Sequence, residues 1–240
     1  MRTAKNAGLL AIGVTWGFRS REDLEAGGAD IIINHPSELV PLLTGGLQDI
    51  DKVEEAFTRN GFVFTYFEHK EDAAAYLFEK CRGKSSAFGG SVTLDEMHLY
   101  DWLKDDGNDV TWHNRGEERR TMVDVYVTSA NALSETGEIV NIDGLGNRVA
   151  GTIWGPKECY VVCGCNKLSP DLYAAMRRAR QVAGPLNARR LNRKTPCVQT
   201  GVCCDCRSPE RICRAMSIIM QPPSSFDHYE IVLIGEHLGY

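Results

Sequence analysis

Five cysteines gather in one polar stretch of the chain: Cys197, Cys203, Cys204, Cys206 and Cys213. Thiolates repel one another unless a cation neutralises them, so four convergent cysteines usually hold a metal ion or cluster. Cys203 and Cys206 form a chelating CxxC pair, with Cys197 and Cys213 on either side. The spacing matches neither a zinc ribbon nor a ferredoxin. Two hypotheses stay open: a centre on Cys197, Cys203, Cys206 and Cys213 that holds an iron–sulfur cluster or zinc, or a metal-free lid of reduced or disulfide-paired thiols.

A glycine-containing turn, Phe88–Thr93, joins an expected strand to an expected helix. Gly89 and Gly90 would allow the backbone to approach a ligand closely. Free N–H groups at the helix start, together with the hydroxyls of Ser91 and Thr93, would then hold a phosphate or carboxylate. The alternative is a strand-to-helix turn that Ser91 caps, with no ligand.

A second loop, Ser129–Gly137, follows an apolar run and carries Glu135. A carboxylate on a loop at the end of a strand suits acid–base or nucleophilic catalysis, so Glu135 is the candidate catalytic residue. The pattern also fits a hairpin turn in which Glu135 is solvated and Asn131 caps a backbone group. Ligand binding by Asn131 stays open in both cases.

A third loop begins at Gly144 and Gly146 and partly imitates a dinucleotide-binding fingerprint. Val149 stands where the third glycine of that fingerprint should fall, and no helix signal follows, which argues against a dinucleotide site. We expect a loop that presents Asn147 and Arg148 to an anionic ligand, or an ordinary β-turn.

Basic side chains crowd a short span, and their default interpretation is a solvated surface. An anionic substrate or an acidic partner is the next interpretation, and nucleic acid is disfavoured because interleaved aromatic residues are lacking. His98, His113 and His237 are isolated in the sequence, and we treat them as structural. The basic residues are Arg177, Arg178, Arg180, Arg189, Arg190, Arg193 and Lys194.

The composition describes the scaffold that must position these groups. The 240 residues are 43% hydrophobic and carry a formal net charge of −5, which suits one large or two small domains and argues against a nucleic-acid-coating protein. No apolar run reaches the roughly 18 residues that a membrane span needs. No signal peptide is recognisable, so we expect a cytoplasmic protein.

Strands and helices alternate along the chain, which predicts an α/β fold. Near-continuous apolar runs suit strands that are covered on both faces, as in a parallel or mixed sheet with flanking helices. These runs are Val123–Val127, Gly137–Ile142, Cys159–Cys163 and Ile231–Ile234. Expected helices span Arg21–Gly27, Glu71–Cys81, the segment from the Gly-Gly turn to about Leu103, and Pro170–Ala183. Ser20 and Asp23 form a capping box for the first of them. Ser169 caps the last one, and Gly184-Pro185 ends it.

Residues 1–45 resemble the C-terminal end of haloacid-dehalogenase-type phosphatases of the phosphoglycolate phosphatase branch. The resemblance rests on Thr3–Leu9, Ile12–Phe18 and Arg21–Asp30. In that family the nucleophilic aspartate, the lysine and the metal-binding acid pair lie upstream of this segment. We therefore expect a fragment without an active site and no phosphatase activity.

Residues 49–240 resemble the lactate-utilisation (LUD) domain family over nearly their whole length. The matching segments are Phe88–Thr93, Ser129–Gly137, Asn141–Arg148, Trp154–Lys157, Gly164–Lys167, Pro185–Ala188 and Thr195–Cys213. The resemblance implies a core like that of sugar-phosphate isomerases and coenzyme A transferases. It also implies a role in oxidising L-lactate to pyruvate in company with iron–sulfur proteins.

Two hypotheses about function follow. The first is an enzyme or redox subunit that binds a small anionic metabolite at its glycine loops. The second is a non-catalytic accessory or assembly protein that docks an iron–sulfur partner through the basic, cysteine-rich region. A coenzyme A transferase-like or isomerase-like enzyme with a structural metal site is a further alternative.

Overall fold

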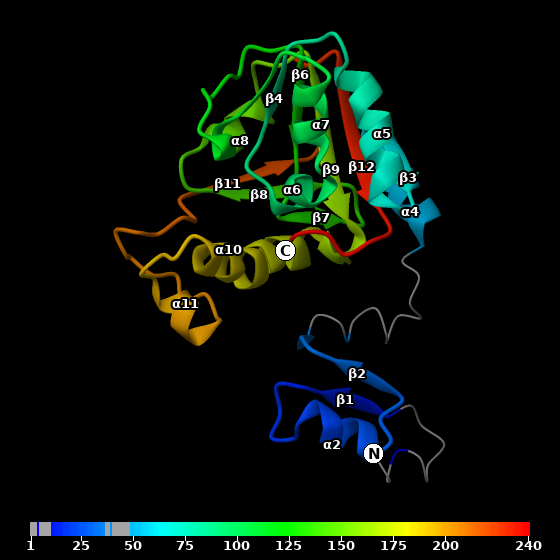
Figure 1. Ribbon diagram of the computed structural model, residues 1–240, viewed down its shortest axis with the longest axis vertical. Coiled ribbons are helices and arrows are strands. Elements are labelled where there is room, and N and C mark those ends of the chain that lie inside the picture. Colours follow the sequence, from blue (N-terminus) through cyan, green and yellow to red (C-terminus); the bar gives the residue numbers. More distant parts are fainter. Residues whose placement is uncertain (1–3, 5–10, 37–38, 40–48) are drawn as a thin grey trace. The chain divides into compact units, whose positions relative to one another are not determined.

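The computed structural model describes residues 4, 11–36, 39 and 49–240 (Figure 1). The chain divides into two compact units, Met1–Ile50 and Asp51–Tyr240. Within the described residues, no helix is both long enough and apolar enough to cross a membrane.

The first unit contains a small parallel β–α–β arrangement. Strands β1 (Ile12–Val14) and β2 (Ile31–Ile33) pair in parallel, and helix α2 (Arg21–Ala26) connects them. The helix begins with the expected capping box, in which the Ser20 hydroxyl accepts from the Asp23 amide and the Asp23 carboxylate accepts from the Ser20 amide. This local prediction is confirmed. Most of Thr3–Leu9, the first segment of the phosphatase-like resemblance, lies outside the described residues.

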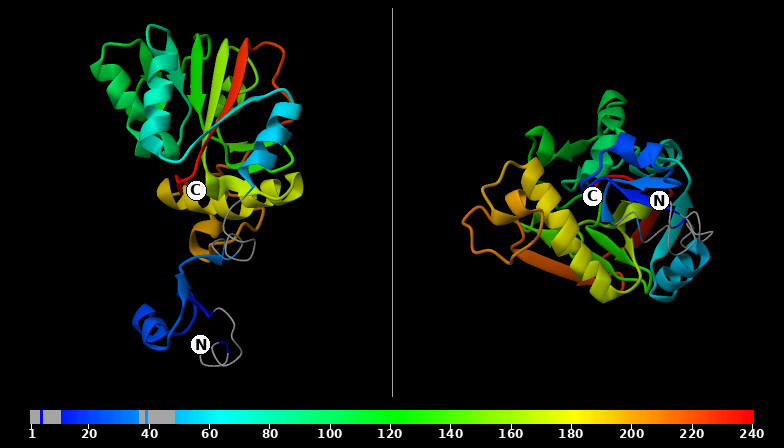
Figure 2. Two further views of the ribbon diagram at one scale, coloured as in Figure 1. Left: turned by 90° about the vertical axis from the view of Figure 1, so that its right-hand side faces the viewer. Right: turned by 90° about the horizontal axis from the view of Figure 1, so that it is seen from below.

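The second unit is built on a six-stranded sheet in which every neighbouring pair of strands is parallel. The sheet order is β3-β12-β9-β6-β4-β5. This arrangement, with helices beside the strands in Figure 2, confirms the predicted α/β class. The strands are β3 (Val63–Phe67), β4 (Ser86–Phe88), β5 (Val110–Trp112), β6 (Val125–Thr128), β9 (Glu158–Gly164) and β12 (His228–Ile234).

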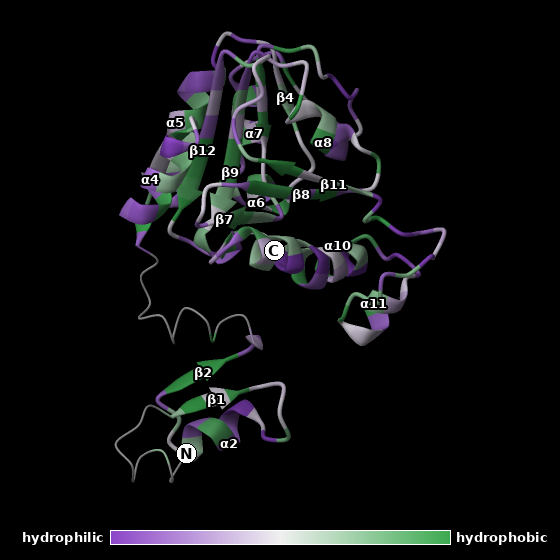
Figure 3. Ribbon diagram, turned by 180° about the vertical axis from the view of Figure 1, so that it is seen from behind, coloured by the Kyte–Doolittle hydropathy of each residue, from purple (hydrophilic) through white to green (hydrophobic). Residues whose placement is uncertain are grey.

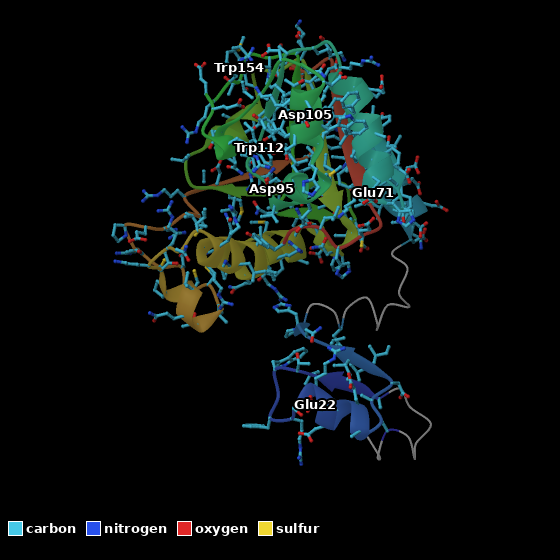
Figure 4. All side chains as sticks on the ribbon, in the orientation of Figure 1. Glu22, Glu71, Asp95, Asp105, Trp112 and Trp154 are labelled. Atoms are coloured by element: carbon cyan, nitrogen blue, oxygen red, sulfur yellow. The ribbon has the colours of Figure 1, made fainter. Side chains whose placement is uncertain are left out.

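Within the described part of the chain, β3, β4 and β5 are preceded or connected by α4 (Ile50–Arg59), α5 (Lys70–Cys81), α6 (Val92–Met97) and α7 (Leu99–Asp105). Helices α5, α6 and α7 bury their apolar faces in one core cluster against the sheet, with Trp112 at 1% exposure among its largest members. Trp112, Glu71 and Asp105 are labelled in Figure 4; Trp112 is buried, whereas Glu71 on α5 and Asp105 on α7 are exposed. Figure 3 colours most of β9 as hydrophobic, and all residues of this strand except the first are buried.

One expected helix is in fact two. The segment after the Gly-Gly turn breaks at His98, whose φ of 54° is left-handed and ends α6 before α7 begins. A left-handed residue cannot continue an α-helix, and histidine tolerates that conformation better than β-branched residues do. Nothing in the spacing of apolar residues marks this break.

A second, four-stranded sheet lies beside helix α9 (Leu172–Arg178) and has the order β10-β7-β8-β11. Its apolar side packs on α9 through a cluster that includes Ala132, Val140, Ala175 and Ala179. Figure 1 shows this sheet above the yellow helices. The strands are β7 (Ala132–Ser134), β8 (Ile139–Asp143), β10 (Leu168–Ser169) and β11 (Ala215–Ile219).

The helix expected over Pro170–Ala183 starts later and runs further. Asp171 is its N-cap, because the Asp171 carboxylate accepts from the Ala174 amide at 2.7 Å. The helix passes through a π-helical turn (η4, Ala179–Ala183) into α10 (Gly184–Arg190), so Gly184-Pro185 does not stop it. A π turn shifts the hydrogen-bond register, which lets the helix accommodate a proline that has no N–H to donate.

Candidate functional site

A cavity of about 280 Å³ opens at the carboxyl ends of the parallel strands of the second unit. The chain leaves β4 outward to β5, and the next strand, β6, joins the sheet on the opposite side of β4. Ligands of open α/β sheets bind at such a reversal of strand order, outside the carboxyl ends of the strands. The loops that follow β4 and β6 both line the cavity, through Gly90, Ser91, Ser129 and Asn131.

Asp143 organises one wall of the cavity by capping the short helix α8 (Asn147–Gly151). Its carboxylate accepts backbone N–H groups from Leu145 at 3.1 Å, Arg148 at 2.8 Å and Val149 at 3.2 Å. Burial would raise the pKa of Asp143, but the amide hydrogen bonds and the Arg148 charge outweigh it and lower that pKa. This helix corrects the expectation that no helix follows the glycine loop.

Arg148 ties this wall to the loop after β6. Its Nη2 donates to Asn131 Oδ1 and to the Ile142 carbonyl, both at 2.6 Å, and its Nη1 lies 3.5 Å from the Gly90 carbonyl. Asn131 Oδ1 also accepts from the Ile142 amide at 2.7 Å, which is the capping role considered for it. A planar guanidinium can serve several carbonyl acceptors at once, so Arg148 holds three loops in register.

Lys167 occupies the floor of the cavity and is only 3% exposed. Its Nζ lies 2.7 Å from Thr93 Oγ1 and 2.7 Å from Ser129 Oγ. Burial, reinforced by the positive charges of Arg178 and Arg148, lowers the pKa of Lys167 to about 8. The sequence analysis missed Lys167 and Ser129, although Lys167 directly follows the apolar run Cys159–Cys163 and its short turn, where parallel strands present side chains to a ligand.

Positive charge dominates the cavity. Lys167, Arg148, Arg190 and Arg193 line it, and within the described part of the chain Asp143 is the one acidic side chain among the lining residues. The whole chain, in contrast, carries a net charge of −5. Such local concentration of one sign attracts ligands of the opposite sign. Part of the basic span, which was expected to be a solvated surface, therefore faces the cavity.

His113 also lines the cavity, beside Asn114 at the end of β5. Burial, with a smaller contribution from the Arg119 charge, lowers the pKa of His113, which favours the neutral ring near pH 7. The interpretation of His113 as a purely structural residue is therefore too narrow, because its side chain faces the same space as the cationic groups.

The structure separates the predicted binding residues into two groups. Gly90, Ser91, Asn131, Gly144, Asn147 and Arg148 line the cavity. Gly89, Thr93 and Gly146 are not among the lining residues, although Thr93 contacts Lys167 from behind. Ser91 caps α6 by accepting from the Leu94 amide, as the capping alternative anticipated.

Gly89 serves packing rather than a ligand. A Cβ at this position would lie 2.3 Å from Thr128 Oγ1, whereas a Cβ on Gly90 would find its nearest neighbours at 3.3 Å. We predict that Gly89→Ala lowers the free energy of unfolding by about 1–3 kcal/mol, the usual cost of overpacking. Gly90→Ala is the matched control and should cost less, because only the His113 and Asn114 side chains must give way. Urea unfolding of both variants measures the difference, and equal midpoints would contradict this role of Gly89.

The candidate catalytic residue Glu135 does not line the cavity. It lies in the hairpin between β7 and β8, where its amide donates to the Ser169 carbonyl, and it is not among the lining residues. Burial raises the pKa of Glu135, with no cationic partner contributing to that shift. The structure thus gives Glu135 no neighbour with which to carry out acid–base or nucleophilic chemistry in this cavity.

Arg211 ties together the backbone of the cysteine-rich segment. Arg211 donates to the carbonyls of Cys206 and Cys213, both at 2.8 Å, and to Asp205 at 2.9 Å. Cys213 lines the cavity, whereas Cys197 and Cys203 do not. Within the described residues, no three His, Cys, Asp or Glu side chains are placed together so as to hold a metal ion. The metal centre expected on Cys197, Cys203, Cys206 and Cys213 therefore stays a prediction.

The comparison with protein families finds a match that covers most of the second unit. The family model of the LUD domain matches residues 50–227. The chain belongs to the LUD domain family. The match begins at residue 50, and no comparison supports a phosphatase-like fragment in residues 1–45. No curated protein matches the chain.

Among solved structures, this LUD-domain chain is similar to a DUF162 family protein from Deinococcus radiodurans. The two are 11% identical, and the alignment covers 78% of this chain and 96% of that chain with a TM-score of 0.47. The likeness is too distant to transfer any residue role.

Proposed function

We propose that the cavity binds a small carboxylate of the lactate–pyruvate type, and that the chain takes part in lactate utilisation as a subunit of an iron–sulfur-linked system. Membership of the LUD domain family supports the metabolic role. The observation that carries the ligand class is the cavity's charge: Lys167, Arg148, Arg190 and Arg193 against the single acidic side chain of Asp143.

The size of the cavity supports a small ligand. Its volume of about 280 Å³ lies just below the roughly 300–1,000 Å³ of pockets that hold drug-sized molecules. Polar groups converge from three loops, with Asn131, Asn147 and Ser91 available to the hydroxyl or carbonyl oxygen of the ligand. The cationic side chains would face its carboxylate.

The test is calorimetric titration of the full chain with L-lactate, pyruvate and lactamide, the neutral amide of lactate. We predict that L-lactate binds about tenfold or more tightly than lactamide, because a charge-assisted hydrogen bond contributes about 1.5–3 kcal/mol. Binding should weaken as the pH rises through about 8, where Lys167 loses its charge. Equal affinities for lactate and lactamide would contradict the proposal, and the absence of binding by either would favour the accessory role.

A coenzyme A transferase-type mechanism with a glutamate nucleophile is less well supported, because Glu135 does not line the cavity. Metal at the four cysteines stays a prediction. Iron and zinc analysis of anaerobically purified protein tests it, and the proposed ligand site does not depend on the result.

A further inference from the structure

A buried cluster of hydroxyl and amine groups lies at the floor of the cavity and has no part in the proposed carboxylate recognition except through the charge of Lys167. Ser129 is 1% exposed, Thr93 is fully buried and Lys167 is 3% exposed. The Lys167 Nζ lies 2.7 Å from both hydroxyl oxygens. Ser129 and Lys167 both line the cavity, so a ligand that fills it reaches them.

The hydrogen bonds around Thr93 fix the direction of the hydrogen bond between Lys167 and Thr93. The Thr93 hydroxyl donates to the Leu238 carbonyl at 3.2 Å. Thr93 Oγ1 must then accept from Lys167, because its one hydrogen is already used. A neutral lysine amine has two hydrogens and one lone pair. The Ser129 hydroxyl donates to the Ala130 carbonyl at 3.4 Å and lies closer, at 2.7 Å, to Lys167 Nζ. With a hydrogen of the neutral amine directed at Thr93, the amine lone pair can accept the Ser129 hydrogen once the hydroxyl turns from the Ala130 carbonyl.

Charged and titratable groups from four elements face Lys167: Cys163 on β9, Arg148 on α8, Arg178 on α9 and Glu96 on α6. Burial is the largest influence, and with the two arginines it lowers the pKa of Lys167 to about 8, whereas Cys163 and Glu96 oppose the shift. A substantial share of Lys167 is therefore neutral at slightly alkaline pH and able to accept a proton.

We propose that Ser129 and Lys167 form a nucleophile–base pair that cleaves an acyl ester or thioester bound in the cavity. A serine whose hydroxyl touches a buried neutral lysine is an activated nucleophile, and serine–lysine pairs serve this purpose on unrelated folds. The positive wall formed by Arg148 and Arg190 selects substrates that carry an anionic group and stabilises the developing oxyanion.

The chemical steps balance without a cofactor. Ser129 Oγ bonds to the acyl carbon while its proton passes to the lone pair of Lys167 Nζ. The tetrahedral intermediate then breaks its bond to the alcohol or thiol, which leaves with that proton. Water attacks the acyl-serine in the same way: it gives a proton to Lys167, which returns it to Ser129 Oγ as the acid departs. The net reaction consumes one water and releases one acid and one alcohol or thiol.

The experiment treats the full chain with a fluorophosphonate, which phosphonylates activated serines irreversibly, and follows the intact mass and the modified peptide. We expect one adduct per chain, mapped to Ser129, with a labelling rate that rises with pH through about 8. In Lys167→Arg, which keeps the charge but cannot accept the proton, the rate should fall at least about 100-fold. Release of thiol from acetyl-coenzyme A and of nitrophenol from nitrophenyl acetate then distinguishes thioester from ester substrates.

Ser217→Ala is the matched control, because Ser217 is also a buried serine but lies on β11 outside the cavity lining. It should label like the parent chain, whereas Ser129→Ala should not label. If Ser129→Ala fails to fold, peptide mapping and the pH profile of the parent chain still decide. An unlabelled Ser129 in the folded parent chain, or labelling unaffected by Lys167→Arg, would overturn the inference. Lactate binding is measured separately, so either proposal can fail alone.

Discussion

A chain that ends after residue 227, where the LUD domain match ends, is expected to be unfolded. Strand β12 (His228–Ile234) would be missing, and it pairs in parallel with β3 on one side and β9 on the other. Ile231, Val232, Leu233 and Ile234 are each 0% exposed. Burying each such side chain contributes about 1.5–3 kcal/mol, so their combined loss of about 6–12 kcal/mol approaches the whole stability of a typical domain.

The lost strand also carries a buried carboxylate with three partners. Glu230 accepts from Thr65 at 2.7 Å and Tyr76 at 2.9 Å, and it contacts His228 at 2.7 Å. Without residue 230, the hydroxyls of Thr65 and Tyr76 lose their partner at the sheet. Circular dichroism and thermal unfolding of the truncated chain measure the effect, and no cooperative transition is expected.

The control is a chain of residues 49–240, which keeps the whole second unit and removes most of the first. Because residues 51–240 form a compact unit with their own core, we expect a cooperative transition close to the one that the full chain shows for this unit. A folded, cooperative chain ending at residue 227 would contradict the central role of β12. Loss of folding in residues 49–240 would show instead that the first unit stabilises the second.

The central strands of the large sheet were predictable because burial on both faces requires unbroken apolar sequence. The Cys159–Cys163 and Ile231–Ile234 runs lie in β9 and β12, at the middle of that sheet. Strands β5 and β11 were not predicted. β5 has only three residues, and β11 begins with exposed Ala215 and Met216, so its position follows from pairing with β8 rather than from its own pattern.

The sequence could indicate a lining residue of the cavity only where that residue belongs to a local motif in a single loop. Gly90, Ser91 and Arg148 belong to short motifs that are recognisable locally. Arg190 reaches the cavity because the helix continues through a π turn past Gly184-Pro185. The Gly-Pro pair indicates the end of a helix in the sequence, so this continuation was not predicted. Lys167 meets Thr93 and Ser129 only because parallel strands bring their carboxyl ends to one edge, and that neighbourhood depends on topology.

Replacing Arg148 with methionine is expected to damage both stability and anion binding. The variant removes the hydrogen bonds of Arg148 to Asn131 Oδ1 and to the Ile142 carbonyl and leaves both acceptors short of a partner. The loss of a hydrogen-bond partner costs about 1–3 kcal/mol for each acceptor, so the two losses together cost about 2–6 kcal/mol. For a unit of this size, at about 2–4 °C per kcal/mol, that corresponds to a fall in Tm of about 4–24 °C. Lactate affinity should fall at least about tenfold, because a cation is lost and three loops lose their tie.

Arg193→Met separates the two effects, because Arg193 also lines the cavity but is exposed. An exposed charge contributes about 0–1 kcal/mol, so its loss should leave Tm almost unchanged and weaken lactate binding only about two- to fivefold. Differential scanning calorimetry and lactate titration of both variants provide the comparison. If Arg148→Met kept the parent Tm and affinity, the guanidinium would not organise the site. If it lowered Tm alone, Arg148 would be a structural tie between loops and the anion would be held by Lys167 and the outer arginines.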